Sequence, residues 1–235
     1  MHSATEAACI KATRSKLHQI AGAYFTSRPD YAQWLRTLPR ESPPDLQDPV
    51  LRTLLAGWMR HHASTRERLP IVDRFFAETL SPIGPVHSVL DLACGLNPLA
   101  IPWMPLTPDA TYLACDIYVD LATFLNAFFG HLGIQGEARI CNLWQNVPVE
   151  PVQVALLLKT IPCLEQLDPD IGRRLLAQTP AEHLLVSFPV HSLGGHAKGM
   201  PAHYSDHMTA LIEGQPWQVR RYEFSTELAF LLSRK

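Results

Sequence analysis

Short apolar runs alternate with longer amphipathic stretches in the second part of the chain, after Pro82-Ile83-Gly84-Pro85. The runs are typical of buried strands, and the stretches between them are typical of helices. This alternation predicts a parallel sheet covered by helices, since parallel strands need crossover connections. The predicted strands are His87–Ala93, Thr111–Asp116, Ala138–Asn142, Val152–Leu158 and His183–Phe188. The predicted helices are Leu121–Leu132, Leu164–Ala177 and Ala202–Glu213.

The chain ends with two apolar runs, Trp217–Phe224 and Glu227–Leu232, that have only Ser225-Thr226 between them. So close a pair predicts an antiparallel hairpin. Together with the five parallel strands, it predicts a mostly parallel seven-stranded sheet in which one strand is reversed. That sheet is typical of the α/β, Rossmann-like fold of class I methyltransferases, which use S-adenosylmethionine.

The first part of the chain has a helical pattern instead. Apolar positions recur at helical spacing through residues 5–38, and Ser27-Arg28-Pro29-Asp30 interrupts them. Four prolines predict a stiff connector over residues 39–49. A second helix is expected from Val50 to Arg60.

A capping box then marks the start of a third helix. Ser64 can accept a hydrogen bond from the backbone, and Glu67 can reach back to it, so we expect a helix running through Leu80. This organisation predicts a small N-terminal helical subdomain over residues 1–82, serving as an RNA-docking extension, and a methyltransferase domain over residues 83–235.

Charge is spread unevenly over these two parts. The 235 residues are 47% hydrophobic, enough for a sizeable core, and their formal net charge of -2 does not by itself favour nucleic acid. Residues 1–70, however, carry 10 basic and 6 acidic side chains, and residues 71–235 carry 10 and 16. This asymmetry predicts a basic docking face on an acidic catalytic body, with chance composition as the alternative.

Several classes of protein are disfavoured. No stretch of about 18 apolar residues is present, and the N-terminus lacks a signal-peptide layout, so we expect a cytoplasmic protein with no membrane partner. The five cysteines include no CxxC pair and fit free thiols in a reducing compartment. The 11 histidines show no ligand spacing, so no metal site is expected.

Candidate ligand-binding residues stand at the ends of four predicted strands. Asp91 precedes a small-residue turn, in which Gly95 would let the backbone approach a ligand. Asp116, at the end of the next strand, can accept both ribose hydroxyls. Asn142-Leu143 and Leu158-Lys159 end the third and fourth strands. Each feature alone fits a solvated strand end, but the four in this order predict S-adenosylmethionine. A pyrophosphate cofactor is disfavoured because the G-x-G-x-x-G spacing is absent.

Several strings of residues resemble the Arm/Rmt family of aminoglycoside-resistance 16S rRNA (guanine-N7) methyltransferases. They are HAST-x-ER at 62–68, VLDLACGLNPLA at 89–100, CDI at 115–117, SFP at 187–189, SLGG at 192–195 and KGM at 198–200. The resemblance covers the chain from about residue 14 onward. It implies a divergent member with a shortened N-terminal extension. The chain also departs from the family's pattern at Asn142, at His191 and at His196-Ala197.

The resemblance implies roles for individual residues. S-adenosylmethionine, and its product S-adenosylhomocysteine, would contact the methionine-end residues, the glycine loop, the ribose carboxylate and the adenine-framing residues. In that order, with two weaker assignments last, these are His62, Ala63, Ser64, Arg68, Asp91, Ala93, Gly95, Asp116, Ile117, Asn142, Leu143, Leu158, Gln166 and Tyr24. The loop from Ser187 to Met200 would border the target base.

Methylation of guanine N7 needs no general base, because N7 is an unprotonated lone-pair acceptor at neutral pH. Alignment of N7 with the methyl–sulfur bond can supply most of the acceleration. We therefore name no catalytic base, only residues that position the target base. Phe188 is a candidate surface for it, with core packing as the alternative. Lys159 and Lys198 are candidate contacts to the base or phosphate, with a solvated strand end and a mobile loop as alternatives.

RNA contact is expected elsewhere in the chain too. The candidates are Lys11, Arg14, Lys16, Lys198, His191 and His196, and the alternative for the first three is a solvated helix face. The expected partner is 16S rRNA within the 30S subunit, not DNA, and the protein is expected to be a monomer.

The expected reaction is methyl transfer to N7 of a guanine in the decoding (A) site, which gives aminoglycoside resistance. Two alternatives remain open. One is a guanine-N7 methyltransferase of a different RNA site, and the other is a non-catalytic cofactor-binding assembly factor.

Overall fold

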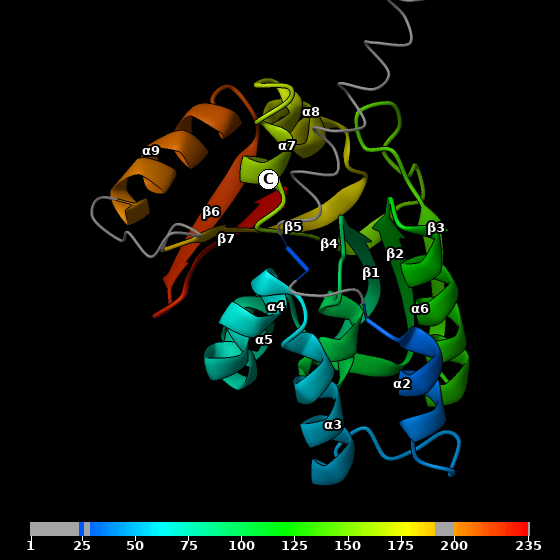
Figure 1. The fold of residues 1–235 in the computed structure, drawn as a ribbon. Helices are drawn as coiled ribbons and strands as arrows, with labels where there is room; N and C mark the ends of the chain where they lie inside the picture. The colour runs from blue at the N-terminus through cyan, green and yellow to red at the C-terminus, as the bar shows by residue number, and fades with distance from the viewer. Residues whose placement is uncertain (1–23, 26–28, 191–199, 235) are drawn as a thin grey trace, which may run out of the picture.

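The computed structural model describes residues 24–25, 29–190 and 200–234. Its centre is a seven-stranded sheet with the strand order β3-β2-β1-β4-β5-β7-β6 (Figure 1). The strands are β1 Val86–Leu92, β2 Leu106–Asp116, β3 Gln135–Ile140, β4 Val152–Leu158, β5 Ala181–Pro189, β6 Trp217–Glu223 and β7 Glu227–Arg234.

Strand β7 is the reversed strand. It pairs antiparallel with both β5 and β6, whereas β1 to β5 pair parallel with one another. The amide of Phe224 donates to the carbonyl of Glu227 at 2.9 Å and closes the hairpin between β6 and β7. The predicted class I sheet with a C-terminal hairpin is therefore confirmed.

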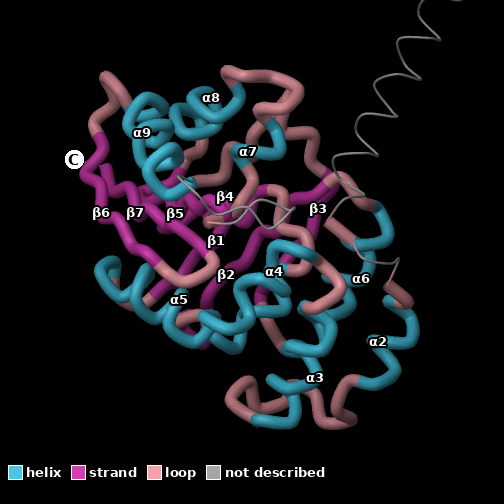
Figure 2. Tube along the Cα trace, turned by 60° about the vertical axis from the view of Figure 1, so that its left-hand side comes forward, coloured by secondary structure: helices cyan, strands magenta, loops and turns pink. Residues whose placement is uncertain are grey.

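Helices cover both faces of the sheet. The helix α7, with α8 and α9, lies on one face, and α2 to α6 lie on the other (Figure 2). The helices are α2 Tyr31–Thr37, α3 Pro49–Met59, α4 Ala63–Arg68, α5 Val72–Leu80, α6 Val119–Leu132, α7 Ile161–Leu164, α8 Ile171–Gln178 and α9 Met200–Ile212.

The N-terminal helices share a hydrophobic core with one face of the sheet. Trp34 of α2 and Trp58 of α3 stack with their ring centroids 5.0 Å apart, and Phe124 of α6 meets both rings edge-on. These rings belong to one buried cluster that also contains Val89 of β1 and Leu156 of β4. Helices α2 and α3 are therefore packed onto the same core as the sheet, while their role as a docking extension stays a prediction.

The predicted capping box at Ser64 is wrong. Helix α4 begins one residue earlier, at Ala63, and its N-cap residue His62 makes no capping hydrogen bond through its side chain. The amide of Ala63 instead donates to the carbonyl of Tyr24 at 2.7 Å. A distant segment thus supplies the acceptor that the box would have provided, and the Glu67 side chain is free to contact Lys159.

Proline residues divide two predicted helices. Pro70 lies in a single 3-10 turn between α4 and α5, and Pro169 lies in the connection between α7 and α8. Proline has no amide hydrogen and restricts the residue before it, so a regular helix does not continue through either position. The predicted helix Leu164–Ala177 is therefore two shorter helices.

Candidate functional site

A tight loop follows β1 at the carboxyl end of the sheet. Two of its residues have a left-handed backbone, Ala93 with φ 53° and Gly95 with φ 50°. A Cβ on Gly95 would lie 2.9 Å from Nε2 of His62, so glycine is required there by conformation and by space. The amide of Cys94 donates to the carbonyl of Cys115 at 2.9 Å and ties the loop to β2.

Asp116, at the end of β2, has its carboxylate fixed by this loop. Its Oδ2 accepts a hydrogen bond from the Gly95 amide at 2.8 Å, and its Oδ1 accepts one from the Ile117 amide at 2.7 Å. Burial raises the pKa of Asp116 above its usual value, although these amides act in the opposite direction. Each oxygen keeps a further lone pair, so an oriented carboxylate can accept ligand hydroxyls.

Asp91, at the end of β1, anchors the other side of the loop. Its carboxylate is 1% exposed, and Oδ2 accepts hydrogen bonds from the Tyr112 hydroxyl at 2.6 Å and from Nδ2 of Asn97 at 2.9 Å. Burial raises the pKa of Asp91 to about 6, and the hydrogen bonds from Tyr112 and Asn97 limit the rise. The protein therefore holds a carboxylate in a site that favours its protonated form more than water does.

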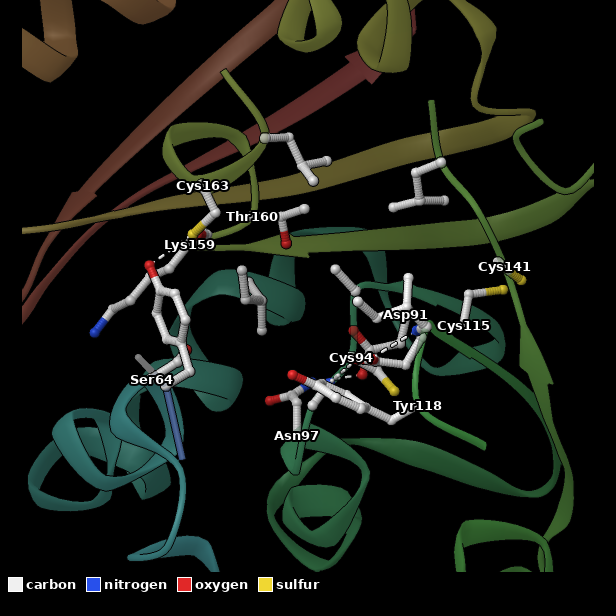
Figure 3. Close-up of a pocket in the computed structure, with 18 of the residues that line it drawn as sticks. Ser64, Asp91, Cys94, Asn97, Cys115, Tyr118, Cys141, Lys159, Thr160 and Cys163 are labelled. Carbon is white, nitrogen blue, oxygen red and sulfur yellow. Dashed lines mark hydrogen bonds between the residues drawn. The ribbon is translucent and has the colours of Figure 1, made fainter. Parts of the chain in front are cut away.

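A pocket of about 960 Å³ opens over these two carboxylates, between α4 and the carboxyl ends of β1, β2 and β4 (Figure 3). That volume is within the usual range for a small-molecule site. The pocket is lined by Tyr24, Phe25, His62, Ser64, Asp91, Ala93, Cys94, Gly95, Asn97, Cys115, Asp116, Ile117, Tyr118, Cys141, Leu143, Trp144, Leu158, Lys159, Thr160, Cys163 and Leu164.

A buried charge cluster holds the wall nearest α4. The guanidinium of Arg68 donates to both carboxylate oxygens of Glu227 at 2.7–3.2 Å and to Oδ1 of Asn97 at 3.0 Å. The hydroxyl of Ser187 donates to Glu227 at 2.5 Å. Burial alone would raise the pKa of Glu227, but the cations of Arg68 and Lys159 hold it below its usual value. The cluster joins α4 to the end of β7.

Lys159 extends from the end of β4 toward α4 (Figure 3). The residue is 4% exposed, and its Nζ lies 2.7 Å from Glu67 and 3.6 Å from Glu227. Its φ of 60° is unusual for a residue other than glycine, and strain of this kind concentrates at functional sites. The predicted alternative of a solvated strand end is therefore wrong for Lys159.

His62 forms part of the same wall as a neutral ring. Burial lowers the pKa of His62 to about 3, and the nearby cations of Arg68 and Lys159 add to that effect. The ring stacks on Tyr24, with centroids 5.6 Å apart, and meets Phe25 edge-on at 4.9 Å. The pocket wall at this point is thus aromatic and uncharged at neutral pH.

Comparisons with known proteins identify the family. A model of the family described as ribosomal RNA methyltransferase (FmrO) matches residues 2–231. The chain belongs to this family. A curated relative from Micromonospora echinospora, named "16S rRNA (guanine(1405)-N(7))-methyltransferase", is 36% identical over 227 residues, 96% of this chain and 82% of its own length. A relative of the same name from Frankia casuarinae is 36% identical over 231 residues, 97% of this chain and 81% of its own.

A solved structure extends the comparison to three dimensions. The 16S rRNA methyltransferase RmtF, crystallised in complex with S-adenosyl-L-homocysteine, matches with a TM-score of 0.77 and 36% sequence identity. The match covers 96% of this chain and 83% of that one. The resemblance to the Arm/Rmt proteins that the sequence motifs indicate is therefore confirmed, and so is the methyltransferase fold.

Most of the predicted cofactor residues of this FmrO-family chain line the one pocket. They come from the segment before α2, from α4, and from the ends of β1, β2, β3 and β4. They are Tyr24, His62, Ser64, Asp91, Ala93, Gly95, Asp116, Ile117, Leu143 and Leu158.

Four of the predicted cofactor residues do not line the pocket. Arg68 is fully buried and has Glu227 and Asn97 as partners. Ala63 lines an adjoining hollow, and Nε2 of Gln166 donates to the carbonyl of Pro162 at 3.3 Å at the surface. Oδ1 of Asn142 accepts the amide of Trp144, two residues on, at 3.2 Å. The structure thus does not bring these four side chains to the space where the cofactor is predicted.

Phe188 does not offer a surface to a base. Its side chain is fully buried and stacks on Tyr204, with centroids 4.6 Å apart, and it meets Phe230 edge-on at 6.0 Å. The alternative of core packing is the one that the structure has. Strand β5 is covered by α9 at this point, and the ring fills the space between them.

The predicted RNA contacts cannot be placed. Six of the predicted residues, Lys11, Arg14, Lys16, His191, His196 and Lys198, lie outside the described residues. Within the part of the chain that is described, no helix is long and apolar enough to cross a membrane. No cluster of three or more possible metal ligands occurs there either.

Sequence reasoning missed most of the cysteines and one tryptophan. Cys94, Cys115, Cys141 and Cys163 all line the pocket, and the sulfurs of Cys115 and Cys141 lie close together (Figure 3). Trp144 lines it as well, although the sequence favours packing for this residue. The available signal was position, because all of these residues follow directly on strands that end in a predicted ligand contact.

Proposed function

We propose that this FmrO-family chain transfers a methyl group from S-adenosylmethionine to N7 of a guanine in 16S rRNA. The observation that carries the proposal is the pocket itself. Its wall contains an amide-oriented carboxylate, Asp116, beside a left-handed glycine loop at the carboxyl ends of parallel strands. Class I methyltransferases bind their nucleoside cofactor at such an edge. The curated relatives are named for methylation of N7 of guanine 1405.

The residues in the wall fit this cofactor. Nδ1 of His62 and Nε1 of Trp144 are buried and have no hydrogen-bond partner among the described residues. Buried polar atoms are seldom left unpaired, so both point to a polar ligand. In our assignment, Asp116 holds the ribose hydroxyls, Leu143 and Trp144 contact the adenine, and Ser64 faces the methionine end.

The reaction asks little acid–base chemistry of the protein. When bound, the cofactor supplies an electrophilic methyl group on a sulfonium centre. The N7 lone pair needs no proton removed, so the chain contributes position and exclusion of water. A neutral His62 also suits this wall, because a protonated ring would repel a cationic sulfonium.

Further features of the proposal concern the setting. We assign the substrate to 16S rRNA within the 30S subunit, acted on by a cytoplasmic monomer, with aminoglycoside resistance as the result. The two alternatives are methylation of a guanine at another RNA site, and cofactor binding without catalysis in subunit assembly. The names of the relatives favour the first assignment.

One experiment separates these functions. The protein is incubated with labelled S-adenosylmethionine and, separately, with 30S subunits, free 16S rRNA or tRNA. Sites of 7-methylguanine are then mapped by borohydride and aniline strand cleavage. We expect cleavage at one decoding-site guanine of 16S rRNA, and none with the Asp116→Ala variant.

Two other results would count against the proposal. Cleavage only outside the decoding site would keep the chemistry and remove the resistance role. Intact cofactor binding with no cleavage of any RNA would overturn the enzymatic function.

A further inference from the structure

A second, smaller hollow of about 330 Å³ adjoins the pocket at the α4 end. It shares three wall residues with the pocket, Tyr24, Ser64 and Lys159, so the two spaces are continuous. It is lined by Tyr24, Ala63, Ser64, Glu67, Lys159, Pro162 and Pro189.

The hollow lies on the side where a substrate would enter. In the proposed function the adenosine portion of the cofactor lies at Asp116 and Leu143, near β2 and β3. The hollow is at the opposite end, beyond the carboxyl ends of β4 and β5, where Lys159 and Pro189 stand. A base that presents N7 to the methyl group would therefore occupy this space, extruded from its stack as base-modifying enzymes require.

The only two charged side chains in the wall of this hollow, among the described residues, form an ion pair. Nζ of Lys159 donates to Oε2 of Glu67 at 2.7 Å, and the Glu67 side chain is 33% exposed. The pair presents an ammonium donor beside two carboxylate acceptors. Cytosine presents the same order of groups to guanine, with one donor followed by two acceptors.

We propose that the Glu67–Lys159 pair reads the Watson–Crick edge of the target guanine, which deepens the proposed function and rests on it. Lys159 donates to O6, and the two oxygens of Glu67 accept from the N1 and N2 hydrogens. Adenine would place an amino group against the ammonium and a bare nitrogen against the carboxylate, so it is rejected. N7 is not on this edge and stays free to face the methyl group.

The surrounding contacts suit a recognition role better than a purely structural one. Arg68 and Glu227 already join α4 to β7 through a fully buried ion pair. Lys159 is held in place by its strained backbone and by hydrogen bonds from its amide to the carbonyl and hydroxyl of Ser187, at 3.0 and 3.1 Å. Glu227, at 3.6 Å, still compensates the Lys159 charge when Glu67 turns toward a base.

The test compares guanine with inosine at the target position, because inosine lacks only the 2-amino group. Reconstituted 30S subunits carrying either base are incubated with labelled S-adenosylmethionine, and kcat/KM for methyl transfer is measured. The enzymes are wild type, Glu67→Gln, Glu67→Ala and the control Glu78→Gln, which removes an exposed ion pair to Arg74 on α5. The ratio of the two kcat/KM values does not depend on how much of a variant is folded.

We expect wild type and Glu78→Gln to prefer guanine by roughly 10- to 100-fold, the effect of one hydrogen bond to a charged group. The Glu67 variants should show a ratio within about twofold of one, while their affinity for S-adenosylhomocysteine stays within about twofold of wild type. A Glu67 variant that keeps the wild-type ratio would overturn the inference. Wild type that methylates no RNA would instead refute the proposed function, and the inference with it.

Discussion

At the Asp116 end of the pocket, the carboxylate is oriented by amides of neighbouring loops. At the Lys159 end, charged side chains from α4, β4 and β7 hold one another. The first arrangement costs little to form, because Asp116 keeps solvent-facing lone pairs and pairs with local backbone. The second removes Arg68 and Glu227 entirely from water. Changes at the first end should therefore affect ligand affinity, and changes at the second should affect folding stability.

The largest expected effect is at the buried ion pair. Glu227→Gln leaves the Arg68 guanidinium buried without its counter-charge, and it should lower the free energy of unfolding by about 3–5 kcal/mol. Urea denaturation followed by circular dichroism measures the change. Glu78→Gln, which breaks the exposed pair with Arg74, is the matched control and should cost at most about 0.5 kcal/mol. Equal losses in the two variants would remove the distinction between the two ends.

The next effect tests the loop at the other end. Gly95→Ala puts a Cβ 2.9 Å from the His62 ring and forces alanine into a left-handed backbone, which costs about 1–3 kcal/mol. We expect the affinity for S-adenosylhomocysteine, measured by calorimetry, to fall by roughly 10-fold or more. Gly57→Ala on α3 is the control, because nothing lies within 4 Å of the added Cβ. That control should bind normally and unfold at a slightly higher temperature; wild-type affinity in Gly95→Ala would contradict the role of the loop.

A smaller effect concerns pH and Asp91. Its pKa is raised in the folded state to about 6, from an ordinary value of 3.8. The stability that this group contributes is thus fully present below about pH 4 and is lost as the pH rises through 6. The stability difference between wild type and Asp91→Asn should therefore fall by on the order of 1–2 kcal/mol over that range. Parallel curves of unfolding free energy against pH would show that Asp91 titrates normally.

Much of the fold follows from local pattern. The alternation of short apolar runs with amphipathic stretches predicts the parallel strands, and two adjacent runs predict the hairpin of β6 and β7. Strand ends also locate Asp91 and Asp116, because a polar residue after a buried run marks the carboxyl edge of a parallel sheet. These features depend on residues close together in the sequence.

The remaining features depend on distant contacts, which local pattern does not encode. Arg68 meets Glu227, 159 residues away, and is thereby drawn from the pocket where it is expected. The carbonyl of Tyr24 takes the amide that a capping box would satisfy. Phe188 lies at a strand end in either role, and only the position of α9 decides that it is core.

The most direct test of the account is a calorimetric titration of S-adenosylhomocysteine into wild type and Asp116→Ala. The account predicts one site per chain in wild type, and an affinity lower by about 10-fold or more in the variant, because the hydroxyl-binding carboxylate is lost. Thermal unfolding of both proteins without ligand serves as the control for folding. Equal affinity in the two proteins would contradict the assignment of this pocket as the cofactor site.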